Sequence, residues 1–149
     1  MDKYMDLAIK LATKAEKNGD VPVGAVIVNS DKVIAKAYNK KEKNKIATKH
    51  AEIIAIEKAC KKIKDWRLND CTLYVTMEPC IMCTGAIIQS RIKKIIYIVE
   101  NPKFGVSKML SDSEVCGKFN HKVEVKKLEN YQNYAEKLNQ FFKKIRDTK

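Results

Sequence analysis

Two short motifs hold residues whose types and spacing could perform hydrolytic metal chemistry. His50 and Glu52 form a His-x-Glu motif, and Cys80 and Cys83 form a Cys-x-x-Cys motif that directly follows Pro79. One neutral imidazole and two thiolates suit zinc, which they bind at about 2.0–2.3 Å. A structural zinc is usually closed by four protein ligands, whereas a catalytic zinc keeps one position open for water. The three ligands His50, Cys80 and Cys83 therefore predict a catalytic zinc site.

Glu52 is the carboxylate of this set that is left off the metal. Residues two apart on a helix do not share a face, so Glu52 is better placed beside a zinc-bound water than on the metal with His50. Zinc lowers the pKa of that water to roughly 7–9. We therefore expect Glu52 to be the general base and acid. It would take a proton from the water, pass one to a ring nitrogen, and help to expel an amine as ammonia.

Pro79 is expected in the first turn of the helix that carries both cysteines, because that position needs no backbone donor. Free N–H groups at such a helix start favour thiolates. Cys80 and Cys83 are three residues apart, so they fall on one helix face, about one turn from each other. This is the arrangement that a shared metal ion requires.

Two simpler interpretations of the cysteine pair are a redox motif and a structural zinc knuckle. A redox pair needs no His-x-Glu motif upstream. A closed zinc site would need a fourth ligand from the remaining candidates, which are Cys60, Cys71, Cys116 and His121. The combined signature is far more specific than either half, and it favours the catalytic interpretation.

These residues resemble the zinc-dependent cytidine deaminase superfamily, since H-x-E with P-C-x-x-C is the signature of zinc-dependent nucleobase deaminases. From about Met5 to about Arg146 the chain is similar to the bacterial tRNA-specific adenosine deaminases. The similarity extends to these stretches: Val21-Pro22-Val23-Gly24-Ala25, Asn39, Leu73-Tyr74-Val75-Thr76-Met77-Glu78, Gly85-Ala86, Ser90-Arg91-Ile92, Asn120-His121-Lys122-Val123-Glu124 and Phe141-Phe142. The last two stretches distinguish the tRNA branch from its relatives.

The resemblance implies hydrolysis of adenosine to inosine at the wobble position of a tRNA anticodon. It implies a homodimer with one Zn2+ per subunit, an anticodon loop splayed into the site, and Asn39 in contact with the flipped base. Two departures from the family pattern concern the rim of the site. Asn101 replaces a common Asp near the nucleotide backbone, and Lys40-Lys41-Glu42-Lys43-Asn44-Lys45 lacks a frequent Pro. Neither departure affects the zinc ligands.

Periodicity predicts the elements that must position these residues. Helical spacing over 5–15 predicts a first helix that ends near Asn18-Gly19, and strands are expected at 23–28, 33–37, 73–76, 95–99 and 123–125. A helix from about Lys49 should bury a stripe of Ile53, Ile56, Cys60 and Ile63. With the family resemblance, this order indicates a three-layer α/β/α fold of the α/β class, with a five-stranded mixed sheet and helices on both faces.

Two segments outside the zinc motifs are candidate contacts for RNA. The long segment from about Glu100 to Asn120 and its surroundings mix basic residues with aromatic rings, which favours a binding element over a solvated loop. The terminal helix is expected to bury Tyr134, Leu138, Phe141, Phe142 and Ile145 and to offer a basic side to phosphate. The substrate-binding candidates are Asn39, Asn101, Lys103, Phe104, His121, Phe142, Lys143 and Arg146.

Composition limits the possible classes of protein. The 149 residues suit one domain spanning 1–149. The start of the chain lacks the layout of a signal peptide and no apolar run could span a bilayer, so we expect a cytoplasmic protein without membrane contact. The 30 basic and 18 acidic residues give a net charge of +12, which suits a polyanionic partner. A genome composition that favours lysine codons could produce the same excess of basic residues. The prediction of a tRNA substrate therefore depends mainly on the motifs.

Two other functions share part of this signature. A deaminase of a free base or nucleoside, such as guanine, cytosine or cytidine, would use the same zinc residues but would not need the basic terminal helix. A non-enzymatic, zinc-stabilised RNA-binding module would close its metal with four protein ligands. We expect Glu52→Ala to separate an enzyme from the latter, because it would abolish deamination while zinc and RNA binding remain.

Overall fold

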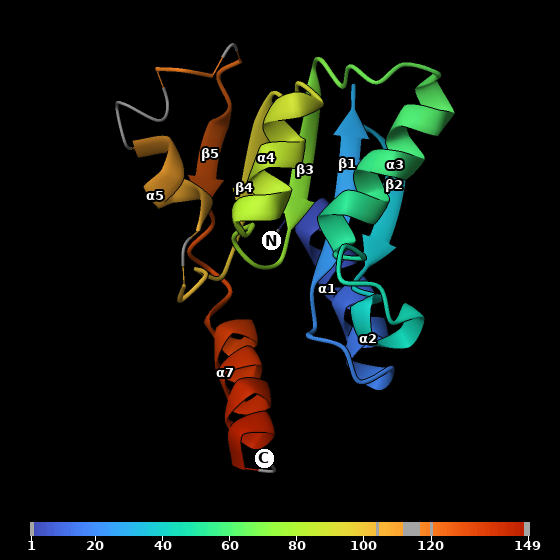
Figure 1. Cartoon of the computed structure of the whole chain (residues 1–149). Helices are drawn as coiled ribbons and strands as arrows, with labels where there is room; N and C mark the ends of the chain where they lie inside the picture. Colours follow the sequence, from blue (N-terminus) through green and yellow to red (C-terminus); the bar gives the residue numbers. More distant parts are fainter. Residues whose placement is uncertain (1, 104, 112–116, 120, 148–149) are drawn as a thin grey trace.

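A five-stranded mixed sheet forms the centre of the protein (Figure 1). The computed structural model describes residues 2–103, 105–111, 117–119 and 121–147. The strands lie in the order β2-β1-β3-β4-β5. Their bounds are β1 Gly24–Asn29, β2 Lys32–Tyr38, β3 Cys71–Val75, β4 Lys94–Tyr97 and β5 Glu124–Lys127. β1 pairs antiparallel with β2 and β3, whereas β3, β4 and β5 run parallel.

A two-residue turn fixes the register of the β1–β2 hairpin. Asn29 pairs with Lys32, and Ser30 and Asp31 have φ angles of 50° and 63°. Positive φ at both turn positions is the arrangement that matches the twist of the flanking strands. The hairpin predicted from the sequence is therefore confirmed, and its open end places Asn39 next to the start of α3 (Ala51–Ile63).

One face of the sheet is covered by α3, by α4 (Ile81–Gln89) and by the short α5 (Val106–Ser111). The strands contribute alternate residues to this core, as expected when only every second side chain points to one face. The strand residues on this side are Ala25, Ile27, Ala35, Ala37, Cys71, Leu73, Val75, Ile95 and Tyr97. In this layer, α3 and α4 both begin at the same end of the sheet, where β2 and β3 end (Figure 1).

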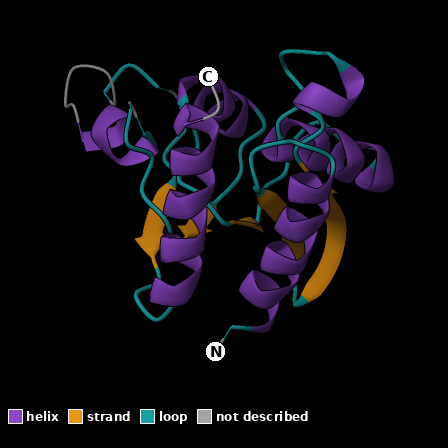
Figure 2. Cartoon of the chain, turned by 90° about the horizontal axis from the view of Figure 1, so that it is seen from below, coloured by secondary structure: helices purple, strands orange, loops and turns teal. Residues whose placement is uncertain are grey.

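The other face is covered by α1 (Lys3–Lys17) and by the beginning of α7 (Gln132–Asp147). Asp2 caps α1 by accepting hydrogen bonds from the N–H groups of Tyr4 and Met5 at 2.9 and 3.1 Å. Gly24 lets α1 approach β1 closely, because a Cβ atom there would collide with the Ala8 carbonyl and lie 2.8 Å from the Ala12 nitrogen. Helices therefore lie on both sides of the strands (Figure 2), and the predicted α/β/α architecture is confirmed.

The predicted buried stripe of α3 is wrong in its rotation about the helix axis. The buried residues are Ala51, Glu52, Ile54, Ala55 and Ala59. Ile53, Ile56, Cys60 and Ile63 are only half-buried. Alanines allow a helix to lie close to a sheet, so the small residues occupy the centre of the contact and the larger side chains pack around it. This rotation turns Glu52 inward.

Two further expectations, on Pro79 and on α7, need correction. Pro79 precedes the N-cap residue Cys80 and does not occupy the first turn of α4. The segment between β4 and β5 contains α5, and the lysine-rich run contains the short helix α2 (Lys41–Asn44). In α7 only Leu138 is buried, while the other predicted core residues, Tyr134, Phe141, Phe142 and Ile145, are half-buried.

Within the described part of the chain, every helix is too short or too polar to cross a membrane.

Candidate active site

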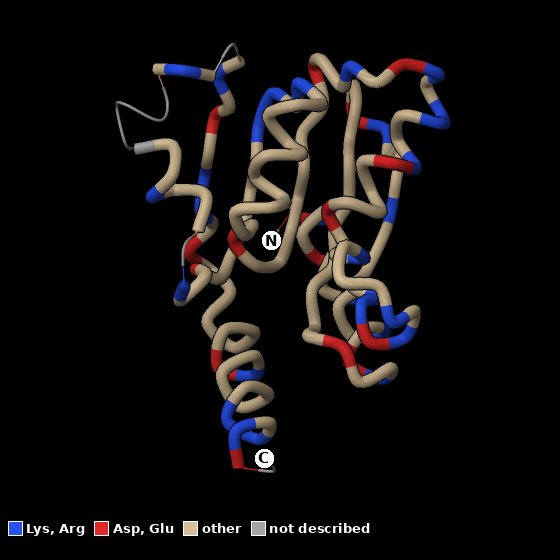
Figure 3. The backbone as a smooth tube through the Cα atoms, viewed as in Figure 1, with Lys and Arg blue, Asp and Glu red and all other residues tan. Residues whose placement is uncertain are grey.

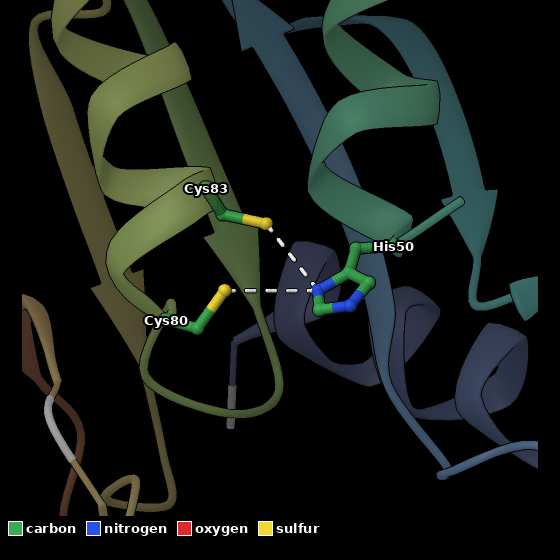
Figure 4. Close-up of side chains that lie close together, drawn as sticks. All are labelled: His50, Cys80 and Cys83. Atoms are coloured by element: carbon green, nitrogen blue, oxygen red, sulfur yellow. Dashed lines mark hydrogen bonds between the residues drawn. The ribbon is translucent and has the colours of Figure 1, made fainter. Parts of the chain in front are cut away.

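His50, Cys80 and Cys83 come together where α3 and α4 begin (Figure 4). His50 is the N-cap residue of α3, Cys80 is the N-cap residue of α4, and Cys83 lies in the first turn of α4. The His50 Nδ1 atom lies 3.7 Å from Cys80 Sγ and 3.5 Å from Cys83 Sγ. All three potential ligand atoms lie within 4.8 Å of one another.

These distances fit a tetrahedral zinc site. With Zn–S near 2.3 Å and Zn–N near 2.0–2.1 Å, a tetrahedron separates nitrogen from sulfur by about 3.6 Å. The two separations of 3.5 and 3.7 Å lie on either side of that value. One imidazole with two thiolates is also a donor set that zinc prefers. The three side chains could therefore hold a zinc ion.

Asn39 leaves the His50 ring free to face the sulfur atoms. An N-cap side chain normally accepts a hydrogen bond from the first turn of its helix, but His50 makes no such bond. Instead, Asn39 Oδ1 accepts a hydrogen bond from the Ala51 N–H at 2.7 Å. The Asn39 amide also donates to the Val21 carbonyl at 3.1 Å. Asn39, which directly follows β2, thus provides the acceptor for a free N–H group at the start of α3.

Mutual hydrogen bonds shift the protonation of the three ligands. A hydrogen bond from the Cys83 side chain lowers the pKa of Cys80 to about 3, and the His50 ring adds to this effect. The same contact raises the pKa of Cys83, because its proton is held between the sulfurs. The hydrogen bond to Cys80 also raises the pKa of His50. Zinc binds thiolates and a neutral imidazole, so metal affinity should depend on pH.

Glu52 is buried beside this group, with 4% of its surface exposed. Burial raises the pKa of its carboxyl to about 7, and a hydrogen bond with Cys83 acts in the opposite direction. Within the described residues, the group that could hold a metal ion consists of His50, Cys80 and Cys83 and does not include Glu52. A carboxyl group with a pKa near neutrality can both accept and return a proton at physiological pH.

A cavity of about 810 Å³ opens from the ligands toward α2 and α7. Its walls come from the segment after α1, the end of β2, the starts of α2, α3 and α4, the loop after β4, and the second half of α7. The lining residues are Gly19, Asp20, Val21, Val23, Asn39, Lys41, Glu42, His50, Glu52, Met77, Glu78, Cys80, Asn101, Pro102, Lys103, Asn139, Phe142, Ile145 and Arg146. Figure 3 shows basic positions around α2 and near the C-terminal end of α7.

Glu78 is a cavity residue whose role the sequence motifs do not indicate. The residue is 5% exposed, and its carboxylate accepts hydrogen bonds from the N–H groups of Asn101 at 3.0 Å and Ser107 at 2.8 Å. It therefore fastens the loop after β4 to the segment that carries Cys80. The sequence signal for this role is an acidic residue directly before Pro79. A carboxylate buried there requires hydrogen-bond donors from a neighbouring segment.

Asn101 has a defined task in the same loop. Its side-chain amide donates to the Glu78 carbonyl at 3.4 Å, and its Oδ1 accepts from the Lys103 N–H at 3.0 Å. An Asp at this position could accept from Lys103 but could not donate to the Glu78 carbonyl. The departure from the family pattern therefore adds a hydrogen bond within the cavity wall.

The predicted substrate-binding residues divide into three groups. Asn39, Asn101, Lys103, Phe142 and Arg146 line the cavity. Lys143 is exposed outside that lining, and His121 Nε2 donates to the Ile92 carbonyl at 2.7 Å, away from it. Phe104 lies outside the described residues, as does Cys116. The contacts of all these residues with substrate stay predictions.

Comparison with known proteins shows the family. The family of MafB19-like deaminases matches residues 1–146. A tRNA-specific adenosine deaminase of Bacillus subtilis is 42% identical over 146 residues, covering 98% of this chain and 91% of that protein. One from Aquifex aeolicus is 40% identical over 150 residues, covering 97% and 95%. This chain belongs to the family of MafB19-like deaminases.

Two solved structures of purine deaminases have a fold similar to that of this chain. One, from a study of A-to-I editing by tRNA:A34 deaminases at the wobble position of transfer RNA, is 35% identical with a TM-score of 0.77. The match covers 84% of this chain and 96% of that one. A guanine deaminase from Bacillus subtilis is 28% identical with a TM-score of 0.63, covering 94% of both chains. The family resemblance recognised in the sequence is confirmed.

Proposed function

We propose that this deaminase hydrolyses adenosine to inosine at the wobble position of a tRNA anticodon. The observation that carries the proposal is the opening of the His50, Cys80 and Cys83 group onto a cavity walled on its far side by Phe142 and Arg146 of α7. The relatives named above act on tRNA, and the first of the two solved structures comes from work on wobble deamination.

The deaminase's own residues supply binding and proton transfer. His50, Cys80 and Cys83 would hold zinc, which would supply Lewis acidity and make hydroxide available as the nucleophile near neutral pH. Glu52 would accept a proton from the attacking water and deliver one to N1 of adenine. It would then pass a proton to the departing amine, so that adenosine and water become inosine and ammonia. Burial beside Cys83 keeps this carboxyl close to the metal ligands.

The size of the cavity favours RNA over a free base. Its volume of about 810 Å³ lies in the upper part of the usual range for ligand sites, about 300–1,000 Å³. A single base would leave much of it empty, whereas the flanking nucleotides of an anticodon would fill it. Lys41, Lys103 and Arg146 line the cavity, where each can face a phosphate.

The decisive experiment is incubation of the zinc-loaded protein with a tRNA that carries adenosine at the wobble position, followed by sequencing for inosine. We expect inosine at that one position. Free guanine, adenine and cytidine are assayed in parallel for ammonia release. Ammonia from one of these without inosine in tRNA would move the protein to the small-molecule deaminases.

A pair of charge reversals on α7 tests the RNA contact. Arg146 lines the cavity and Lys143 does not, although both are exposed cations of the same helix. We expect Arg146→Glu to raise KM for tRNA about tenfold or more and Lys143→Glu to change it less than about threefold. Equal effects of the two variants would show that α7 acts only through its general charge.

Metal content tests the ligand assignment. We expect Cys80→Ser to lower the bound zinc to well below one equivalent, because a neutral hydroxyl replaces a thiolate ligand. Cys60→Ser is the control, since Cys60 lies at the far end of α3. Full zinc content in Cys80→Ser would contradict the assignment.

The remaining assignments are also proposals. We propose a single deaminase domain over residues 1–149, supported by the family match over 1–146. A homodimer and a cytoplasmic location stay predictions, and light scattering of the purified protein would test the homodimer.

A further inference from the structure

Residues 20–23, the last four residues before β1, connect several walls of the cavity. The Asp20 carboxylate accepts hydrogen bonds from the N–H groups of Glu42 at 2.8 Å and Lys43 at 3.3 Å, in α2. The next two residues offer their carbonyl groups. We call residues 20–23 the connecting segment.

α7 is fastened to this connecting segment through Tyr134. The Tyr134 hydroxyl donates to the Pro22 carbonyl at 2.6 Å. Proline fixes its own φ angle, which restricts the direction in which this carbonyl can point. One residue earlier, the Val21 carbonyl accepts the hydrogen bond from Asn39 that belongs to the start of α3. The anchor of α7 and the cap of α3 therefore lie on neighbouring carbonyl groups.

The second half of α7 depends on this anchor for its position. Leu138 is the buried residue of α7 in the described part of the chain. The cavity residues Asn139, Phe142, Ile145 and Arg146 all follow it. Figure 1 shows α7 extending away from the strands toward the C-terminus. The helix rises 1.5 Å per residue, so a small tilt at Tyr134 becomes a displacement of several ångströms at Arg146.

We propose that Tyr134 is a positioning residue for RNA binding. Its bond to Pro22 sets the distance between the α7 wall and the wall that carries Asn39, and thereby places Phe142 and Arg146 against the bound anticodon. This inference rests on the proposed function. Tyr134 is absent from the cavity lining, so its effect on substrate must pass through α7.

The test compares Tyr134→Phe with Tyr4→Phe. Both variants lose one hydroxyl that donates to a backbone carbonyl, and the Tyr4 hydroxyl reaches the carbonyl of Asp31 in the exposed hairpin turn. We expect Tyr134→Phe to raise KM for tRNA about 3- to 10-fold, the effect of one lost hydrogen bond, with kcat within about twofold of the original. Tyr4→Phe should leave both constants unchanged. General destabilisation would instead lower the active fraction and therefore kcat.

A second variant shows whether Tyr134 acts through α7. Adding Tyr134→Phe to Arg146→Ala should raise KM by less than the single change does, because part of what Tyr134 positions is already gone. An unchanged KM in Tyr134→Phe, or the same proportional rise with and without Arg146, would overturn the inference.

Hydrogen exchange without RNA separates this inference from the proposed function. We expect faster exchange of the amides of residues 139–147 in Tyr134→Phe and not in Tyr4→Phe. Absence of inosine with the original protein would refute the proposed function alone. Unchanged exchange in α7 would refute the role of Tyr134, whatever the substrate is.

Discussion

Asn39 Oδ1 accepts the Ala51 N–H at 2.7 Å, and this bond separates the capping of α3 from the coordination of metal. His50 occupies the N-cap position but makes no capping bond, so its ring can face Cys80 and Cys83. Asn39 lines the cavity as well. It is therefore both a candidate substrate contact and a support for the ligand group.

Asn39→Ala should lower both stability and zinc affinity. Loss of a helix cap costs about 0.5–2 kcal/mol, and the Val21 carbonyl also loses its donor. Asp2→Ala is the control, because Asp2 caps α1 away from the ligands. We expect both variants to unfold at lower urea concentrations but only Asn39→Ala to bind zinc more weakly. Equal zinc affinities in competition with a chelator would contradict the supporting role.

Glu52→Gln should abolish deamination while the bound zinc and the affinity for tRNA remain. The amide keeps the size of the side chain but cannot shuttle a proton, so we expect kcat to fall at least about 100-fold. Glu57→Gln is the matched control on α3, since Glu57 is an exposed partner of Lys49. Elemental analysis and a single-turnover assay check the result. Loss of zinc in Glu52→Gln would mean that this carboxylate is a ligand.

Gly105→Ala should disturb the loop that Glu78 holds. A Cβ atom at Gly105 would overlap the Glu78 carboxylate, which must then move away from Asn101 and Ser107. We expect a loss of about 1–3 kcal/mol in stability and a higher KM, because Lys103 and Asn101 line the cavity.

Gly85→Ala provides the opposite expectation. A Cβ atom at Gly85, inside α4, would meet nothing within 4 Å. Alanine is the better helix former, so this change should add about 0.5–1 kcal/mol. Thermal unfolding of both variants checks the pair, and similar shifts would show that the crowding around Gly105 is unimportant.

Tyr134 should make the protein sensitive to alkali. Burial raises its pKa to about 12 from the ordinary value of 10.0. Because the folded pKa is the higher one, this stabilisation is complete below pH 10 and disappears as the pH rises toward 12. Two pKa units correspond to roughly 2–3 kcal/mol. The difference in unfolding free energy between the original protein and Tyr134→Phe should shrink across that range, and a constant difference would contradict it.

Sequence alone predicted the chemistry of the candidate site and determined the class of fold. His-x-Glu and Pro-Cys-x-x-Cys specify residue types, and their spacing places the ligands at helix starts through local geometry. Alternating and helical periodicities similarly predicted the hairpin and the order of the elements, because those patterns depend on near neighbours in the chain.

Only the tertiary structure decided which side chains meet across the cavity. Lys143 and Arg146 are both cations on α7, and the packing of that helix puts Arg146 alone of the two on the cavity wall. The capping of α3 by Asn39 and the bond from Tyr134 to Pro22 join residues distant in sequence. Such contacts depend on how whole elements pack, which periodicity along one segment does not encode.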